Sequence, residues 1–468
     1  MDMTSMMNET VVSNDEPPLI ATKANAAVGA PPRSAAAPLD PRQNPRWSDW
    51  RWHIRNRIRT FEELVEFFPS LRTSPGIAKV AAKYPMAITP YYASIVKNAD
   101  FSDPVFQMAV PQVNELYDPD FLHADPLEEE EDMPVPGLVH RYRDRALLMS
   151  TTTCSMYCRH CTRKRVAGMR ESTISVCQLN AITDYLHAHP EIKDVIISGG
   201  DPLTMSTSLL ERILQAVRAV PSVDIIRIGT RVPVVLPQRI TAELVQVLAK
   251  YHPVWVNVHF NHPNEITAEA EAACARLANA GIPLGNQSVL LRGINDEPHV
   301  MEDLCRRLVR MRVRPYYLFQ CDLVRGVEHF RTPISRGIEI MEYLRGRLSG
   351  LAIPTYVVDT PHGGGKIPVL PNYIVSVSPT HTVLRNFEGM IVNYPEPVEP
   401  IKRTTPIASK SGTHGVWELA SGQASAITPS SAFRQKRRQQ RKLQRMVHQQ
   451  EHPEFSSLLN SLMNEPST

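Results

Sequence analysis

The chain has no long apolar run. No stretch of its 468 residues approaches the roughly 20 apolar residues that a membrane-spanning helix needs. The first 45 residues are rich in Ala, Pro and Ser and lack the apolar core of a secretory signal. Their acidic residues are also atypical of an organelle transit peptide. We therefore expect a protein with neither a membrane span nor a secretory leader.

Cysteine is scarce, with seven in the chain, three of them within eight residues. This usage is typical of a reducing compartment rather than of a disulfide framework, so we expect a cytoplasmic protein. The net charge is also small, at +3, although residues 434–445 carry seven Lys or Arg and no acid. A single basic run is usually a solvated segment, which makes it weak evidence for nucleic-acid binding.

What the chain does contain is a C-x3-C-x2-C motif, formed by Cys154, Cys158 and Cys161. A short loop can fold three such thiolates around one face of a [4Fe–4S] cluster and leave one iron open. An open iron that can chelate a small molecule is what radical chemistry from S-adenosylmethionine (SAM) requires. Three unrelated core cysteines are the alternative. Zinc fits poorly, because His160 directly precedes Cys161 and is badly placed as a fourth ligand.

Composition divides the chain into five segments. In order, we expect a disordered N-terminal extension, a helical region, an α/β region, a C-terminal segment and a low-complexity basic tail, over residues 1–45, 46–140, 141–330, 331–400 and 401–468. Within the helical region, Thr60 and Glu63 form a capping-box pattern that predicts the start of a helix. The acidic run Glu128–Asp132 is typical of an exposed loop.

Short β-rich runs alternate with helical patterns after residue 145. The predicted strands are 146–150, 194–198, 224–229, 254–260, 284–290 and 316–320, and the predicted helices are 175–188, 207–219, 241–251, 266–280, 299–312 and 334–348. This alternation predicts βα units and a parallel sheet, either open and doubly wound or closed as a barrel. Polar groups follow several of the strands, at the edge where barrel sites lie, which indicates one shared active site.

Two glycine-containing segments stand at that edge. Gly199 and Gly200, between Ser198 and Asp201, follow the second strand, and they let the backbone approach a ligand such as the amino group of SAM. Lys366 follows three glycines, but Ile367 comes next and the P-loop pattern fails. A mobile lysine suits a Schiff base. A solvent-exposed loop lysine is equally consistent with the residues alone.

Charged residues add two further candidates. Arg141, Arg143 and Arg145 precede the first strand, and alternate spacing in an extended segment would put them on one face, as a phosphate site or as a solvated edge. Asp322 and Asp359 each end a predicted strand. Two carboxylates at one edge can hold a cationic group, although either alone suits a turn.

Six motifs occur in the chain in a characteristic order. They are Cys-Ser-Met-Tyr-Cys-Arg-His-Cys-Thr-Arg, Ser-Gly-Gly-Asp, His-Phe-Asn-His-Pro, Gly-Asn-Gln-Ser-Val-Leu-Leu, Arg-Pro-Tyr-Tyr and Gly-Gly-Gly-Lys. In this order they resemble the lysine 2,3-aminomutases, which are radical SAM enzymes that also use pyridoxal phosphate (PLP). The resemblance covers about residues 47–397. It implies a partial (β/α)6 radical SAM barrel with an N-terminal helical extension and a C-terminal segment that carries the PLP lysine.

The resemblance also implies a role for each matching residue. The cluster ligands would be Cys154, Cys158 and Cys161; the lysine bound to PLP, Lys366; the phosphate contacts, Arg141 and Arg145; the SAM contacts, His259 and Gln287, beside Ser198, Gly199, Gly200 and Asp201; the partner of the substrate carboxylate, Arg163; and the pair around the distal substrate cation, Asp322 and Asp359. The implied reaction is the conversion of L-lysine to β-lysine, an isomerisation.

Some features of the family do not carry over, and some questions stay open. The clostridial-type enzymes share a structural zinc between subunits, but Glu297 stands at the first zinc-cysteine position here and no cysteine follows Cys321. We therefore expect no structural zinc. Arginine is the alternative substrate, because its guanidinium pairs well with carboxylates. An RNA-modifying radical SAM protein is a more distant alternative. We also expect a flavodoxin or ferredoxin as electron donor and a homo-oligomer.

Overall fold

The computed structural model describes residues 41–74, 76–361, 363–378 and 380–397, together with residues 439, 440 and 443. The predicted disorder of residues 1–45 and the predicted basic tail over 401–468 therefore lie almost wholly outside the described residues. None of the helices within the described residues has the length and apolar character that a membrane crossing demands.

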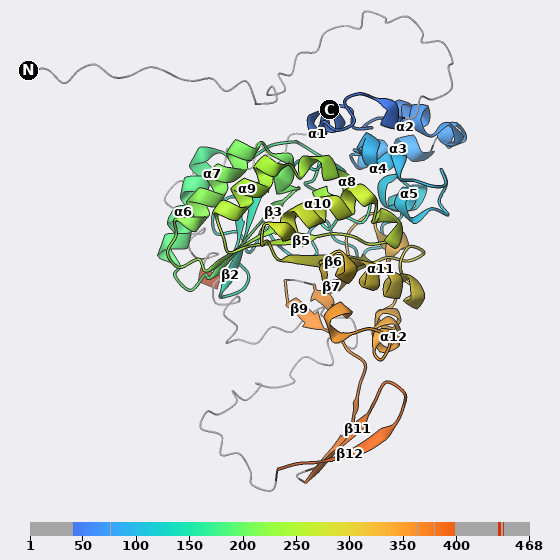
Figure 1. Ribbon diagram of the computed structural model, residues 1–468, viewed down its shortest axis with the longest axis vertical. Helices are drawn as coiled ribbons and strands as arrows, with labels where there is room; N and C mark the ends of the chain where they lie inside the picture. Colours follow the sequence, from blue (N-terminus) through green and yellow to red (C-terminus); the bar gives the residue numbers. More distant parts are fainter. Residues whose placement is uncertain are drawn as a thin grey trace, which may run out of the picture.

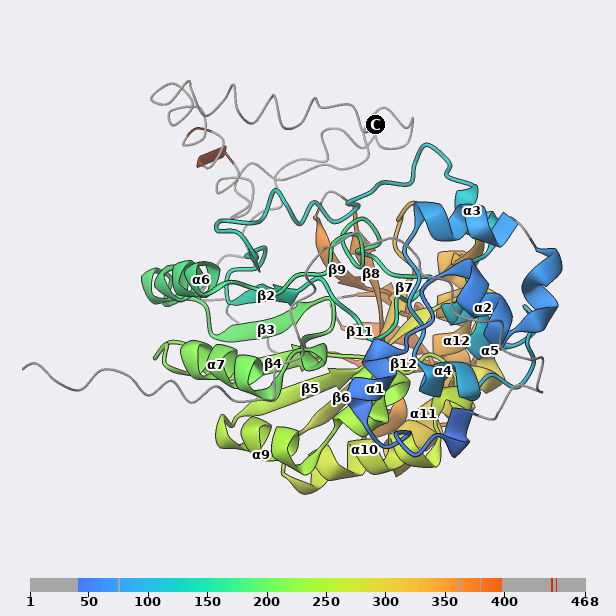
Figure 2. The ribbon, with the colours of Figure 1, turned by 90° about the horizontal axis from the view of Figure 1, so that it is seen from above.

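A nine-stranded sheet forms the centre of the molecule, with its strands in sequence order from β1 to β9. The strands are β1 Leu138–Val139, β2 Arg145–Thr151, β3 Asp194–Gly199, β4 Ile225–Gly229, β5 Val254–Val258, β6 Leu284–Leu290, β7 Arg314–Gln320, β8 Thr355–Thr360 and β9 Gly365–Pro368. Neighbours from β2 to β8 are parallel, and β1 and β9 add antiparallel edges. The sheet curls into an open half-barrel (Figure 2), which confirms the partial-barrel prediction.

Amphipathic helices cover the outer side of this sheet (Figure 2). They are α6 Val176–Ala188, α7 Thr207–Arg218, α9 Ala242–Lys250, α10 Ala268–Asn279, α11 Pro298–Arg310 and α12 Ile334–Leu344. The short helix α8 Val232–Val235, whose residues are all buried, follows β4. In α7 the buried residues are Leu210, Ile213, Leu214 and Val217, at the i, i+3, i+4, i+7 spacing that places them on one face. The spacing of apolar residues thus accounts both for the helix and for the side it buries.

The sheet does not stop at the predicted boundary near residue 330. Helix α12 completes the sixth βα unit, and β8 adds a seventh parallel strand that pairs with β7 through Tyr317, Leu318 and Phe319. The segment that carries Lys366 therefore begins as part of the barrel sheet. Helix α12 also ends at Leu344, earlier than the predicted residue 348.

The N-terminal helical region packs against the loops that follow β4 and β5 (Figure 1). Its helices are α1 Trp50–Arg55, α2 Phe61–Phe67, α3 Gly76–Lys83, α4 Pro90–Ser94 and α5 Pro104–Ala109. The predicted capping box is present, because Glu63 N–H donates to the Thr60 hydroxyl while the Glu63 carboxylate accepts from the Thr60 backbone. The short 3-10 helices are η1 Pro41–Gln43, η2 Pro69–Thr73, η3 Val113–Leu116, η4 Pro202–Thr204, η5 Pro237–Arg239, η6 Pro263–Glu265, η7 Glu328–Phe330 and η8 Gly350–Ala352.

A separate three-stranded antiparallel sheet follows β9, with strands β10 Ile374–Val377, β11 His381–Arg385 and β12 Ile391–Pro395. Figure 1 shows β11 and β12 projecting away from the half-barrel. Several of its apolar side chains are exposed, among them Val377 and Ile391.

Candidate active site

The three motif cysteines lie on the loop that follows β2, at the carboxyl end of the strand. Burial and the nearby Cys158 raise the pKa of the Cys161 thiol to about 11. Burial also raises the pKa of the Cys154 thiol, and Asp201, Cys161 and Cys158 add to the effect. Cys158 thus acts on both of the other thiols, and the role of the three as cluster ligands stays a prediction.

The donor set suits a cluster better than a single ion. Among the described residues, no three His, Cys, Asp or Glu side chains converge as the ligands of one metal ion do. A [4Fe–4S] cluster binds each thiolate through a different iron, so its ligands need not converge. A bound metal also keeps coordinating thiols deprotonated despite their raised pKa values. The residues present therefore fit the cluster.

Residues of the N-terminal region form hydrogen bonds with both ends of the cysteine loop. Glu115, which is fully buried, accepts from Arg159 at 2.6 Å and from Lys164 at 2.6 Å. Burial lowers the pKa of Lys164 to about 8, even though Glu115 favours its charged form. At the other end of the loop, Arg57 donates to the carbonyl oxygen of Cys154 at 2.6 Å. The helical extension thus acts as a support for the loop.

The Ser-Gly-Gly-Asp segment touches the same loop. Gly199 has a positive φ of 119°, and a Cβ there would collide with the carbonyl oxygen of Thr151. The backbone N–H of Asp201 donates to the Thr153 carbonyl at 2.8 Å. The Asp201 carboxylate accepts from the Thr230 hydroxyl and from the Arg231 backbone. The two glycines are therefore needed for close backbone packing, and the role of this segment toward SAM stays a prediction.

Two further predicted SAM contacts lie side by side. His259 Nδ1 is 3.2 Å from the carbonyl oxygen of Gln287, which links the end of β5 to the middle of β6. Burial lowers the pKa of His259 to about 4, so the ring is neutral at physiological pH. A neutral imidazole can donate one hydrogen bond and accept another.

The two aspartates that we predict to hold the substrate cation lie near the predicted PLP lysine. Lys366 Nζ lies 3.1 Å from Asp359 Oδ1, because β8 and β9 pair these two residues in register. Burial and the charge of Asp359 raise the pKa of Asp322 to about 7. The hydroxyl of Thr162, next to Cys161, donates to Asp322 at 2.6 Å. One edge of the sheet therefore holds the lysine, both aspartates and the end of the cysteine loop.

The arginines before β2 do not follow the predicted geometry. Residues 142–144 bend between β1 and β2, so alternate spacing does not place the arginines on one face. Arg141 donates to Asp132 at 2.9 Å and to the Leu127 carbonyl. Arg145 lies over the Tyr142 ring, 3.8 Å from its centroid.

Tyr142 connects Arg145 with Lys366, because its hydroxyl oxygen accepts from the backbone N–H of Lys366 at 3.0 Å. An arginine, a phenol and a lysine amine at one place suit a phosphate-bearing aldehyde. These residues therefore fit PLP.

The acidic run is only in part the exposed loop that we predicted, because Glu130 and Glu131 are exposed and two other members are not. Glu129 is 5% exposed and Asp132 is 1% exposed. Glu129 accepts from Arg163 Nη2 at 2.7 Å and from Nε at 2.9 Å. Burial opposes ionisation of Glu129, but Arg163 outweighs it and holds the carboxyl pKa below its ordinary value. The two buried carboxylates turn inward because arginines elsewhere in the chain compensate their charges.

Arg163 also contacts the Ser-Gly-Gly-Asp segment. Its Nη1 lies 3.4 Å from the carbonyl oxygen of Gly199, close to Thr151 and Thr152. The sequence motif placed Arg163 after the last cysteine but gave no sign of Glu129, Glu115 or Tyr142. Their hydrogen bonds to the cysteine loop and to Lys366 join residues 34 to 224 positions apart, so no local pattern could have found them.

Comparison with known proteins agrees with this geometry. The family model described as "Radical SAM superfamily" matches residues 148–304, and the model described as "Lysine-2,3-aminomutase" matches residues 341–454. The L-lysine 2,3-aminomutase of Clostridium subterminale is 52% identical over 396 residues, which cover 84% of this chain and 95% of the relative.

Two other relatives bear on the substrate. The L-lysine 2,3-aminomutase of Acetoanaerobium sticklandii is 51% identical over 84% of this chain and 96% of its own length. The glutamate 2,3-aminomutase of Clostridioides difficile is 44% identical over 76% of this chain and 85% of its own length. The chain is thus more similar to the two lysine enzymes than to the glutamate enzyme.

Proposed function

The chain belongs to the lysine 2,3-aminomutase family of radical SAM enzymes, and we propose that it moves the α-amino group of L-lysine to C3 to give β-lysine. Such an enzyme is an isomerase that uses a [4Fe–4S] cluster, SAM and PLP. When bound, these groups supply a carbon-centred radical and a carrier for the migrating nitrogen. The protein supplies binding, orientation and exclusion of water.

The observation that carries the proposal is that Asp359 lies 3.1 Å from Lys366 Nζ and that its charge raises the pKa of Asp322. Two carboxylates at one place repel each other, and a cation between them relieves that repulsion. The ε-ammonium of lysine, with a pKa of about 10.4, is such a cation at neutral pH. The carboxylate of glutamate would add a third negative charge, so the pair disfavours glutamate as substrate.

The other residues divide between the two ends of the substrate and the cofactors. We assign the substrate carboxylate to Arg163, the PLP amine contact to Lys366 and the PLP phosphate to Arg145 and Arg141. Tyr142 holds the Lys366 backbone, and so it steadies the lysine at this place. Cys154, Cys158 and Cys161 hold the cluster, with SAM between them and the residues His259, Gln287 and Ser198 to Asp201.

Anaerobic turnover tests the assignment. Protein reconstituted with iron and sulfide is incubated with SAM, PLP and dithionite, and separately with lysine, arginine or glutamate, and β-amino acids are measured by chromatography. We expect β-lysine, with arginine and glutamate converted far more slowly. Equal or faster conversion of arginine or glutamate would contradict the proposal. Lys366→Ala is the matched blank, because it removes the amine that binds PLP.

The family membership supports further expectations, and the departure from it at Glu297 supports one more. We propose that a flavodoxin or ferredoxin supplies the electron, that the protein is a homo-oligomer in the cytoplasm, and that it holds no structural zinc. Reduction by purified flavodoxin, light scattering and metal analysis test the first, second and last of these.

A further inference from the structure

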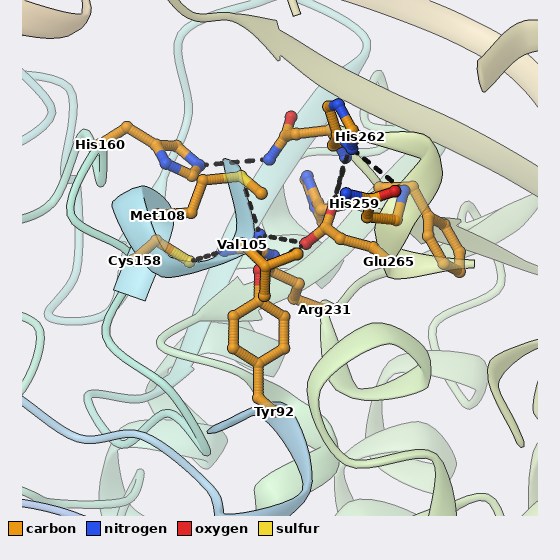
Figure 3. Close-up of polar contacts among 12 residues, drawn as sticks. Tyr92, Val105, Met108, Cys158, His160, Arg231, His259, His262 and Glu265 are labelled. Carbon is orange, nitrogen blue, oxygen red and sulfur yellow. Dashed lines mark hydrogen bonds and ion pairs between the residues drawn. The ribbon is translucent and has the colours of Figure 1, made fainter. Parts of the chain in front are cut away.

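Arg231 lies two residues after the end of β4 and directs its guanidinium at one of the motif cysteines. Its Nη1 lies 2.6 Å from Cys158 Sγ (Figure 3). Arg231 is 7% exposed, so solvent screens this contact poorly. A guanidinium stays protonated in proteins, and its hydrogen bond to an ionised partner is stronger than a neutral one.

The guanidinium is held in this position by buried acceptors. Nη2 of Arg231 lies 2.6 Å from Glu265 Oε1, which also accepts from the Tyr92 hydroxyl at 2.8 Å. The other Glu265 oxygen accepts from the backbone of Asn261 at 2.6 Å. The backbone N–H of Arg231 donates to Asp201 at 2.7 Å. Arg231 is therefore fixed at both its backbone and its side chain before any cofactor binds.

One donor of this group is left over. Among the described residues, the buried Nε–H of Arg231 has no hydrogen-bond partner. Buried donors are nearly always paired. This Nε–H lies on the same edge of the guanidinium as Nη2, which binds Glu265, so the contact that points to the cluster is the one from Nη1 to Cys158.

We propose that Arg231 raises the reduction potential of the cluster and that Glu265 is the positioning residue that aims it. Reduction adds one electron from an external low-potential donor, and hence one negative charge, to the cluster, while Arg231 keeps its proton. Hydrogen bonds to ligand sulfur and nearby positive charge stabilise the more negative state. This inference rests on the proposed function for its cluster but not on lysine being the substrate.

The test compares reduction potentials of the reconstituted full chain without SAM, by redox titration followed by electron paramagnetic resonance. The double variant Arg231→Gln with Glu265→Gln removes both buried charges, so neither remains unpaired. Arg231→Lys keeps the charge but loses the two-pronged contact. Arg227→Gln is the matched control, since Arg227 lies on the same strand and pairs with Asp194 instead of a cysteine. Iron content and thermal unfolding are measured on every variant.

We expect the double variant to load iron and to lower the equilibrium constant for reduction at least tenfold, about 59 mV for one electron. Arg231→Lys should give a smaller fall, and Arg227→Gln none. Wild-type potentials in the iron-loaded Arg231 variants would overturn the proposal, and so would a loss of SAM affinity with an unchanged potential. If the double variant loads no iron, the reduction potential of Arg231→Lys decides instead: a fall supports the proposal, and a wild-type value overturns it. A wild-type chain that fails to convert lysine would sink the proposed function and leave this comparison intact.

Discussion

Glu129 holds Arg163 through both carboxylate oxygens, with Nη2 to Oε1 at 2.7 Å and Nε to Oε2 at 2.9 Å. This contact uses one edge of the guanidinium and leaves Nη1 directed toward the carbonyl of Gly199. Arginine recognises carboxylates through pairs of parallel N–H donors, so fixing one edge also fixes the direction of the other. Glu129 thus orients the residue to which we assign the substrate carboxylate.

Glu129→Gln should therefore weaken lysine binding more than it affects turnover. We expect KM for lysine to rise about tenfold or more, equivalent to roughly 1.4 kcal/mol, with iron and PLP content retained. Loss of a buried partner should also lower the unfolding temperature. Glu130→Gln is the control, because Glu130 is exposed and lies 3.4 Å from Arg165. Steady-state kinetics on both variants decide, and an unchanged KM in Glu129→Gln would refute the orienting role.

Cys158→Ala should abolish the cluster. Reconstituted wild-type protein should carry about four irons and four sulfides per chain. The variant should lose most of this iron and all SAM cleavage, because two thiolates remain where three are needed. Cys177→Ala, which changes an exposed cysteine outside the motif, should keep both. Full activity in Cys158→Ala would rule out the assigned cluster ligands.

Lys366→Ala separates the two cofactors. The visible absorbance of bound PLP should disappear, while iron content stays at the wild-type level, because Lys366 contacts Asp359 and no cysteine. Lys250→Ala, at an exposed lysine on α9, serves as control. Retained PLP absorbance in Lys366→Ala would move the assignment to another amine.

Most of the scaffold could be predicted because its signals are local. Runs such as Val195, Ile196 and Ile197 indicate a buried strand, and Ser or Thr before an apolar helix face predicts its first residue. Residues at the carboxyl ends of parallel strands share one edge by topology alone. Topology alone therefore predicts that Asp322 lies at the same edge as the cysteine loop. In the structure Thr162 contacts Asp322 there.

The contacts between distant charges could not be predicted in this way. An acidic run has the same local pattern whether it is solvated or paired, and only the fold brings Arg163 to Glu129 and Arg141 to Asp132. Arg231 gave no signal either, since nothing in its neighbours marks a buried arginine. Pairing of β8 with β7 was missed because strand partners depend on the whole sheet rather than on the segment.

Asp322→Asn or Asp359→Asn should cut lysine turnover by orders of magnitude. Removing one partner of a buried charge interaction costs roughly 3–5 kcal/mol, and the lysine ε-ammonium loses such a partner in either variant. Cluster content and PLP absorbance should remain. Asp303→Asn, at an exposed aspartate on α11, is the control. If the aspartates only stabilised turns, specific activity would stay near normal while the unfolding temperature fell.

The pH dependence of lysine binding should follow the ionisation of Asp322. Burial and Asp359 raise its pKa to about 7, Glu129 also favours the neutral form, and Thr162 and Lys366 oppose them. Below this pH the neutral carboxyl pairs poorly with an ammonium group, so KM for lysine should fall as pH rises from 6 to 8. Asp322→Asn should flatten this limb of the profile. A wild-type KM independent of pH over this range would contradict the assignment.

Ionisation of Asp322 should strengthen lysine binding but lower the stability of the fold. A carboxyl whose pKa is higher in the folded state binds more protons there than in the unfolded state between about pH 4 and 7, so its contribution to stability falls as pH rises through that window. Above pH 7 both states are ionised and the full cost is present. Asp322 keeps partial access to solvent, which screens its charge. We therefore expect its ionisation to cost on the order of 1–2 kcal/mol of folding free energy, less than the whole pKa difference between the folded and unfolded states would give. Without substrate, Asp322→Asn should therefore unfold at a higher temperature than wild type at pH 8 and at a similar one at pH 4.5. Added lysine should narrow the difference at pH 8 by stabilising the wild type alone, and a variant less stable than wild type at both pH values would show that Asp322 is not held near neutrality by its surroundings.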